Sequence, residues 1–350
     1  MLISVFYQTG SASASYHQTT FQGSPMQFRT EVELPPSPLR LSPYESVAFV
    51  GSCFASHIGA LMAECLPPKR IVVNPFGTLY NPASILTILE ELARPSFQIP
   101  KQLSFRANDG LWHHWWCSTI FSASSQETLT SQLQNAWQTA HDLLRKARVL
   151  FVTFSSDTAY RLANGKDSEA GTVVANCHKE PASRFRVQSN CTAGLLEAWR
   201  ILLLKLHELN PSLHAVFTLS PYRYAKYGFH ESALEKARLL LFIDTLCTQL
   251  PDMASYFPAF EIITDELRDY RFYAADMLHP SEQAAAYVWE RLRQWIFSPE
   301  LSEYAQDRQA ILRDLTHRPI NPHSEGWTLF VQKSEERRKR FVSKWGEDFQ

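Results

Sequence analysis

Short apolar runs alternate with amphipathic stretches along most of the chain. A strand covered on both faces reads as a continuous apolar run, whereas a surface helix repeats apolar residues with a period near 3.6. The apolar runs predict buried strands at residues 47–50, 71–73, 148–154, 172–175, 215–219 and 260–264. The helical spacing predicts helices at residues 54–65, 83–93, 126–147, 192–209, 231–250 and 281–296. This alternation predicts an α/β protein with a mostly parallel sheet that helices cover on both faces.

The two ends of the chain differ from its middle. Residues 1–25 are rich in Ser, Thr, Gln and Gly, so we expect a flexible N-terminal extension, with Met26 as the candidate natural start. Residues 26–300 hold the alternating elements and form the expected main domain, with an irregular, aromatic-rich stretch at 96–121 as a strand-rich insertion. Residues 301–350 form the expected C-terminal helical extension, whose basic sequence is typical of a solvated terminal helix.

Charge and hydropathy exclude several kinds of partner. The 350 residues carry 34 Lys and Arg against 35 Asp and Glu, a net charge of −1. We therefore expect no nucleic-acid partner and no binding to an anionic membrane surface. No apolar run approaches the roughly 20 residues that span a bilayer, and the first residues lack the pattern of a signal peptide. These features favour a cytoplasmic protein.

The cysteines and histidines do not form a metal-binding pattern. None of the six cysteines stands in a C-x-x-C pair, which excludes a zinc ribbon and a thioredoxin-like motif. A chain of this size folds without disulfide staples, so we expect most or all of the cysteines to be reduced. His113 and His114 are adjacent, a spacing that suits a single metal site poorly. We expect neither a metal nor a cofactor.

The first chemical motif is the segment VAFVGSCFASHIG at residues 47–59. A predicted buried strand ends at Gly51, and a predicted helix begins just beyond Ser52 and Cys53. This turn would hold the Ser52 hydroxyl at the carboxyl edge of the sheet, where α/β proteins bind their ligands, beside the free N–H groups of a helix start. Ser52 could instead be only the helix N-cap. Cys53 is a rival nucleophile, because a thiol at a helix start can have a lowered pKa.

The second motif is DMLHP, in which Asp276 precedes His279 by three residues. One local turn brings such a carboxylate beside the imidazole, where it orients the ring and stabilises its protonated form. A single D-x-x-H pair is common by chance, so this motif gains weight only together with others.

The segments GSCFA (51–55), NPFGTLYNP (74–82), VVANCHK (173–179) and DMLHP (276–280) occur in this chain in a characteristic order. With them, the chain closely resembles the GSCFA-domain family over about residues 27–300, and that family resembles the SGNH or GDSL-type hydrolases. The resemblance implies a three-layer α/β/α sandwich with about five strands in its sheet.

The resemblance also implies roles for individual residues. Ser52 would be the nucleophile, His279 the general base and Asp276 the carboxylate that orients it. An oxyanion hole would be formed by the backbone N–H groups of Ser52 and Gly77 and by the side-chain amide of Asn176.

Other residues of the same segments have open roles. Asn74 and Asn81 are alternatives to Gly77 in its loop, and His178 could line the pocket or simply hydrogen-bond the chain. Tyr224 stands where the family often has a histidine at the end of an S-P-x-x-H segment, and we treat it as a possible pocket residue.

Together, the motifs and the resemblance predict a metal-independent serine ester hydrolase. Its expected substrate is a small molecule or glycan that carries a short acyl ester, with acetyl as the first candidate. Two alternatives remain: a thiol hydrolase that uses Cys53, and a non-catalytic domain that binds a glycan or a protein.

Overall fold

A five-stranded parallel sheet is the centre of the structure, a computed structural model that describes residues 29–163 and 171–346. The described residues from Glu31 onward belong to one compact unit. The expected extension at 1–25 and the candidate start at Met26 lie outside the described residues. The strands of the sheet, in chain order, are β1 (Ser46–Gly51), β2 (Ile71–Val73), β5 (Ala147–Phe154), β9 (His214–Leu219) and β10 (Ala254–Tyr256).

The order of the strands, β10-β9-β5-β1-β2, determines where a ligand can enter. β1 pairs in parallel with β2 on one side and with β5 on the other, and Phe49 is in register with Val73 and with Phe151. From β1 the chain first builds outward through β2 and then crosses to the opposite side for β5. Open α/β sheets bind ligands at the carboxyl ends of the strands where the order reverses in this way. The topology thus indicates a site at the ends of β1 and β5.

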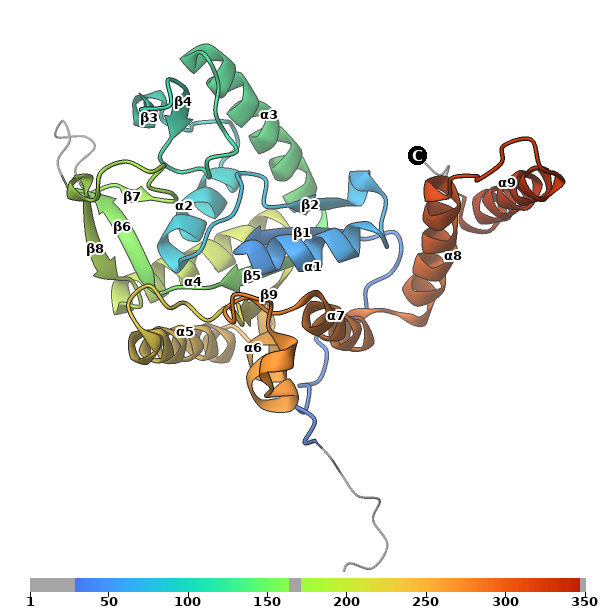
Figure 1. The fold of residues 1–350 in the computed structure, drawn as a ribbon. Coiled ribbons are helices and arrows are strands. Elements are labelled where there is room, and N and C mark those ends of the chain that lie inside the picture. The colour runs from blue at the N-terminus through green and yellow to red at the C-terminus, as the bar shows by residue number, and fades with distance from the viewer. Residues whose placement is uncertain (1–28, 164–170, 347–350) are drawn as a thin grey trace, which may run out of the picture. The chain divides into compact units, whose positions relative to one another are not determined.

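Helices cover both faces of this sheet (Figure 1). Successive residues of β1 point to opposite faces, so Ala48 and Val50 belong to one buried cluster whereas Val47 and Phe49 belong to the other. The first cluster includes residues of α2 (Pro82–Leu92), α3 (Gln126–Leu144), α4 (Ala193–Leu209) and α5 (Phe229–Gln249). The second includes residues of α1 (Cys53–Ala63) and α7 (Glu282–Ile296). The structure confirms the expected α/β fold, with a layer of helices on each face of a parallel sheet.

Two further helices, α8 (Pro299–Thr316) and α9 (Glu325–Trp345), form the C-terminal part of the chain. The ring of Tyr304 packs against Phe341 and Trp345, with centroids 5.3 and 5.2 Å apart, and all three belong to the second core cluster. Short 3₁₀-helices occur at Pro68–Arg70, Lys101–Leu103, Ala182–Arg184 and Tyr270–Phe272.

Two small antiparallel sheets stand apart from the parallel one. The expected insertion at 96–121 contains β3 (Ser104–Arg106) paired with β4 (Trp112–His114). A three-stranded sheet has the order β7-β6-β8 and consists of β6 (Thr158–Leu162), β7 (Val173–Val174) and β8 (Phe185–Ser189). The strand predicted at 172–175 is therefore β7 of this small sheet and does not belong to the main sheet. We call β6, β7, β8 and their connecting loops the insertion sheet.

The strand predicted at residues 260–264 is wrong. These residues form the end of α6 (Ala259–Glu261) and the start of a π-helix (Ile262–Leu267), and the fifth strand of the sheet is β10, just before them. Ile262 and Ile263 are both fully buried in the second cluster. A short, wholly apolar run fits a buried helical turn as well as it fits a buried strand, and periodicity cannot separate the two.

Candidate functional site

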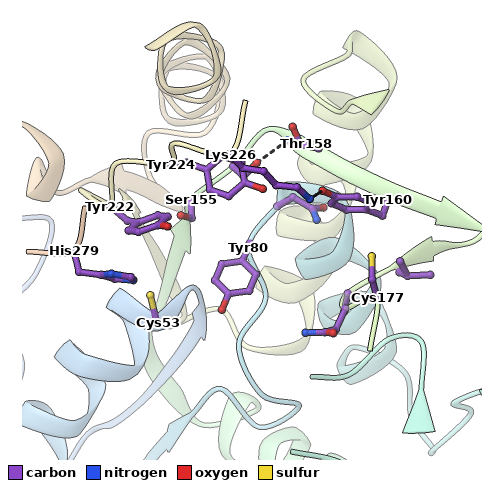
Figure 2. Close-up of a pocket in the computed structure, with 15 residues that line it drawn as sticks. Cys53, Tyr80, Ser155, Thr158, Tyr160, Cys177, Tyr222, Tyr224, Lys226 and His279 are labelled. Carbon is purple, nitrogen blue, oxygen red and sulfur yellow. Dashed lines mark hydrogen bonds between the residues drawn. The ribbon is translucent and has the colours of Figure 1, made fainter. Parts of the chain in front are cut away.

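A cavity of about 380 Å³ lies at the carboxyl edge of the parallel sheet, where the strand order reverses (Figure 2). Its volume is within the range of small-molecule sites. Cys53 follows β1, Ser155 follows β5, and Tyr222 follows β9, so three neighbouring strands deliver residues to it. The other lining residues are Tyr80, Asn81, Ser156, Thr158, Tyr160, Val174, Ala175, Asn176, Cys177, Tyr224, Lys226 and His279.

Asp276 and His279 are joined as their spacing predicts. The His279 Nδ1 donates to Asp276 Oδ2 at 2.5 Å, and the backbone N–H groups of His279 and Leu278 donate to Oδ1 at 3.0 and 2.9 Å. The His279 backbone N–H, the imidazole and the Leu278 N–H together lower the pKa of Asp276 to about 2. The carboxylate is thus ionised at neutral pH. Because Nδ1 serves Asp276, Nε2 is the ring nitrogen left to exchange a proton at the cavity.

Tyr222 supports the histidine from the loop that follows β9. Its ring lies 4.3 Å from the His279 ring, centroid to centroid. Burial raises the pKa of Tyr222, and negative charge on Asp276, Cys53 and Tyr80 raises it further. The Tyr222 hydroxyl is therefore neutral at ordinary pH.

Ser52 is the N-cap of α1, but its side chain is 0% exposed and makes no capping hydrogen bond. The Oγ is buried and has no hydrogen-bond partner among the described residues. Ser52 does not belong to the cavity lining, and its backbone N–H donates to the Thr153 carbonyl at 3.2 Å. The role of the Ser52 hydroxyl as nucleophile stays a prediction. The Ser52 N–H was also expected to donate to the oxyanion, but its hydrogen bond to Thr153 already engages it.

Cys53, the first residue of α1, is half-buried and lines the cavity. In Figure 2 its Sγ points toward the ring of His279. Burial raises the pKa of the Cys53 thiol, while the backbone N–H groups of Phe54 and Cys53 and the charge of Lys236 act to lower it. Burial prevails, so the resting thiol is protonated and needs a base to become a nucleophile. The geometry favours Cys53 over Ser52.

The backbone of the turn before α1 is fixed by Gly51 and Asn74. Gly51 has φ +147°, and a Cβ at this position would lie 2.3 Å from the Thr153 carbonyl oxygen. Asn74 Oδ1 accepts from the Gly51 N–H at 2.7 Å, while its Nδ2 donates to Ser56 Oγ at 2.7 Å. Asn74 therefore holds the turn instead of lining the cavity.

Gly77 and Asn176, both expected in the oxyanion hole, differ in their surroundings. The Gly77 N–H donates to the Asn74 carbonyl at 2.8 Å, and the glycine packs against Ser118 outside the cavity lining. Asn176 lines the cavity, and its Oδ1 accepts from the His178 N–H at 2.7 Å. This bond orients the Asn176 side chain and commits only its oxygen, so the amide N–H groups remain as donors. Asn81 is the second lining amide, although its Oδ1 caps α2 through Ser84 N at 2.9 Å.

Of the three residues expected in the pocket, Cys53 and Tyr224 line the cavity and His178 does not. His178 is buried beside Phe105, His113 and Trp115, and its Nε2 lies 3.2 Å from the His114 carbonyl oxygen. Burial, together with the nearby charge of His113, lowers the pKa of His178 to about 4. His178 is therefore a neutral packing residue at ordinary pH.

Lys236 of α5 is a buried amine beneath the cavity. Its Nζ donates to the carbonyl of Ser155 at 2.7 Å and to that of Ser220 at 2.8 Å, which ties together the ends of β5 and β9. Burial lowers the pKa of Lys236 to about 7, while negative charge on Glu235 and Cys53 opposes the change.

Several lining residues escaped the sequence analysis, among them Tyr80, Ser155, Tyr160, Tyr222 and Lys226. A signal existed for two of them: Ser155 directly follows the strongest apolar run, and Tyr222 follows the next predicted strand, so both stand at the carboxyl edge. Tyr160 and Lys226 lie in polar segments that gave no such signal.

The described residues contain no group of three or more His, Cys, Asp or Glu side chains that could hold a metal ion. All six cysteines are free thiols. In the part of the chain that the structure describes, no helix has the length and apolar character needed to cross a membrane.

The model of the GSCFA family matches residues 46–292, which include Cys53, Asn176, Asp276 and His279. No curated protein matches the chain. Since the matched segment covers well over half of the 350 residues, the chain belongs to the GSCFA family.

Proposed function

We propose that this protein is an acyl-ester hydrolase in which Cys53 is the nucleophile, His279 the general base and Asp276 the residue that orients the base. The observation that carries the proposal is that Cys53 and His279 line the same end of one cavity, with Asp276 bound to the far nitrogen of the imidazole. Acyl transfer requires a nucleophile, a base beside it and a group that orients the base, and these three residues offer one of each.

The reaction would proceed in two steps. His279 Nε2 takes the proton of the Cys53 thiol as Sγ attacks the ester carbonyl, and it then gives that proton to the departing alcohol, which leaves a thioester on Cys53. Water, deprotonated by His279, attacks the thioester; the carboxylic acid leaves and the thiol regains its proton. One ester and one water thus give one acid and one alcohol.

The oxyanion of each step needs preorganised donors. The first N–H groups of a helix have no intrahelical acceptor, and those of Cys53 and Phe54 lie beside the thiol. The Asn176 amide adds a side-chain donor from the insertion sheet. These groups take the place that the sequence assigned to the N–H groups of Ser52 and Gly77, both of which are bonded to carbonyl oxygens. A short acyl ester on a sugar remains the expected substrate class, by the resemblance alone.

The test compares Cys53→Ala, Ser52→Ala and Cys177→Ala in hydrolysis of 4-nitrophenyl acetate. Cys53→Ala should lower kcat by at least ~10³-fold, because a nucleophile and its base act as a unit. Cys177 lines the same cavity, so Cys177→Ala controls for the loss of a thiol there, and it should keep full activity.

Labelling of the intact protein identifies the nucleophile independently of the substrate. Iodoacetamide should modify Cys53 before Cys177, whose pKa burial raises to about 11. Loss of activity in Ser52→Ala, with labelling of Ser52 by a fluorophosphonate, would return the nucleophile to the serine. Full activity in both Ser52→Ala and Cys53→Ala would overturn the proposed chemistry.

A further inference from the structure

The cavity has a second end, away from the proposed reaction centre. Figure 2 shows Cys53 and His279 at one end and Tyr160 at the other, with Lys226 reaching toward Tyr160 and Tyr224 between the two ends. The residues of the second end come from β6 of the insertion sheet and from the loop that follows β9. None of them has a part in the two chemical steps proposed above.

Lys226 is held in place although its side chain is exposed. Its Nζ donates to the Tyr160 hydroxyl at 2.6 Å, and the Tyr160 hydroxyl lies 2.7 Å from that of Tyr227. The ammonium also lies 5.0 Å from the centre of the Tyr160 ring and 5.2 Å from that of Tyr227. The hydrogen bond to Tyr160 raises the pKa of Lys226, so the group is a cation at neutral pH. A lysine restrained in this way has lost much of the side-chain freedom that usually weakens its interactions.

The charges around the cavity are unbalanced. Lys226 is the one permanently charged residue among the lining residues, and the lining includes no Asp or Glu. Among the described residues, no carboxylate forms an ion pair with Lys226. The buried Glu235 faces the hydroxyls of Ser156 and Thr158, while Asp276 faces His279. Lys226 therefore presents a positive charge to the cavity that no acidic side chain of the lining offsets.

Neutral groups that suit a polar ligand surround this charge. The lining includes hydroxyls, amides and the rings of tyrosines. Among the hydroxyls are those of Tyr160, Tyr224 and Thr158, and one of the amides belongs to Asn176. Hydroxyls bind oxygen-rich ligands by hydrogen bonds, and aromatic rings pack against flat or ring-shaped ones. A cavity of about 380 Å³ has room for a single ring with its substituents.

We propose that Lys226, Tyr160 and Tyr224 form a subsite for an anionic group, and that the natural substrate is a small acidic ester. The ester carbonyl would lie at Cys53, with a carboxylate, phosphate or sulfate of the same molecule at Lys226. This inference rests on the proposed ester hydrolysis for its reaction centre, but the anion site can be measured without turnover.

The kinetic test uses two esters of similar size, 4-nitrophenyl butyrate and mono-4-nitrophenyl glutarate, the second of which carries a carboxylate. In Lys226→Met, the KM for the glutarate ester should rise roughly 10-fold or more, because a charge-assisted hydrogen bond is lost. The butyrate ester should be hydrolysed as before, and Lys226→Arg should restore most of the preference. Lys205→Met, which removes an exposed lysine of α4, is the matched control and should change neither ester.

Binding without turnover separates the two proposals. Calorimetry on the Cys53→Ala protein should detect glutarate, inorganic phosphate or sulfate, and the strongest of the three identifies the anion. Lys226→Met in the same background should weaken that binding by a similar factor. If the unaltered protein hydrolyses neither ester but anions still bind in a way that depends on Lys226, the proposed reaction is contradicted and the subsite is supported. Unchanged binding in Lys226→Met, or an equal loss for both esters, overturns the subsite.

Discussion

The parallel sheet and the insertion sheet contribute to the cavity in different ways. β1 and β9 are buried along their whole length, and their loops bring Cys53 and Tyr222 to fixed positions. β8 of the insertion sheet is exposed at four of its five residues, and the sheet contributes hydroxyls and an amide. Cys53, which must be placed within fractions of an ångström to react, thus stands directly after a buried strand. Of the groups proposed for substrate recognition, Tyr160 stands on the insertion sheet, the region with the smaller core, whereas Tyr224 and Lys226 stand on the loop that follows β9.

The largest effect should come from the reaction side of this comparison. Asp276→Asn should keep the fold but lower kcat at least ~10³-fold, because the amide no longer holds His279 with Nε2 as the proton acceptor. Asp269→Asn is a matched control: Asp269 also accepts a backbone N–H two residues later, from Arg271 at 2.9 Å, but it contacts no histidine. Steady-state kinetics with 4-nitrophenyl acetate checks both variants, and equal activity of the two would remove Asp276 from the mechanism.

Acid should destabilise the structure around three buried histidines, of which two lie by the antiparallel strands and one begins β9. Burial lowers the pKa of His114, of His178 and of His214 to about 4, against an ordinary value of 6.5. Between pH 6.5 and pH 4 the unfolded chain binds protons that the folded chain does not, so stability falls as the pH falls. Each such histidine lowers the free energy of unfolding by about 3 kcal/mol over that range.

Thermal unfolding and hydrogen exchange at pH 7 and pH 5 measure this effect. Exchange should increase first around β4, the loop after β7 and the start of β9, where the three histidines lie. His178→Gln does not titrate, so its melting temperature should depend less on pH than that of the unaltered protein. An identical pH dependence in both would show that His178 does not contribute.

Valine-to-alanine substitutions, each of which removes two methyl groups, compare how much side-chain packing stabilises the two regions. Val149 of β5 is 0% exposed, whereas Val187 of β8 is 53% exposed. Val149→Ala should lower the free energy of unfolding by about 2 kcal/mol, and Val187→Ala should change it by less than about 0.5 kcal/mol. Chemical denaturation measures both, and similar losses would show that β8 is packed more tightly than its exposure indicates.

The smallest effect should come from one hydroxyl of the insertion sheet. Tyr160→Phe removes the acceptor that holds Lys226, and the KM for mono-4-nitrophenyl glutarate should rise about 3-fold, with kcat unchanged. Tyr44→Phe, on an exposed ring elsewhere, is the control. A change in kcat instead of KM would connect Tyr160 to the chemical step.

Four strands of the parallel sheet, β1, β2, β5 and β9, could be predicted from the sequence, because they are continuous apolar runs separated by helical periodicity, whereas the short β10 was missed. β6 and β8 could not be predicted, because the segments TAYRL and FRVQS mix polar and apolar residues, and β8 is also exposed to solvent along most of its length. The strand expected at 260–264 failed for the opposite reason: its apolar residues are buried, but in a helix.

The candidate site could be predicted where its residues lie close together in the sequence. Asp276 and His279 are three residues apart, and one turn joins them. The relation between Ser52 and Cys53 depends on how the chain turns into α1, and adjacent residues there face different surroundings. The tyrosines and Lys226 are brought together only by tertiary structure, so no spacing in the sequence could indicate them.

Gly51 has a consequence for how the protein can vary. A side chain at this position would collide with the backbone of Thr153 in the neighbouring strand, whatever its chemistry. In a library that randomises residues 47–59 one at a time, Gly51 should therefore fail a selection for folded protein. Substitutions at Cys53 should pass that selection and fail only one for activity. Comparing the two selections would therefore distinguish Gly51, which the turn needs in order to form, from Cys53, which the turn only holds in position.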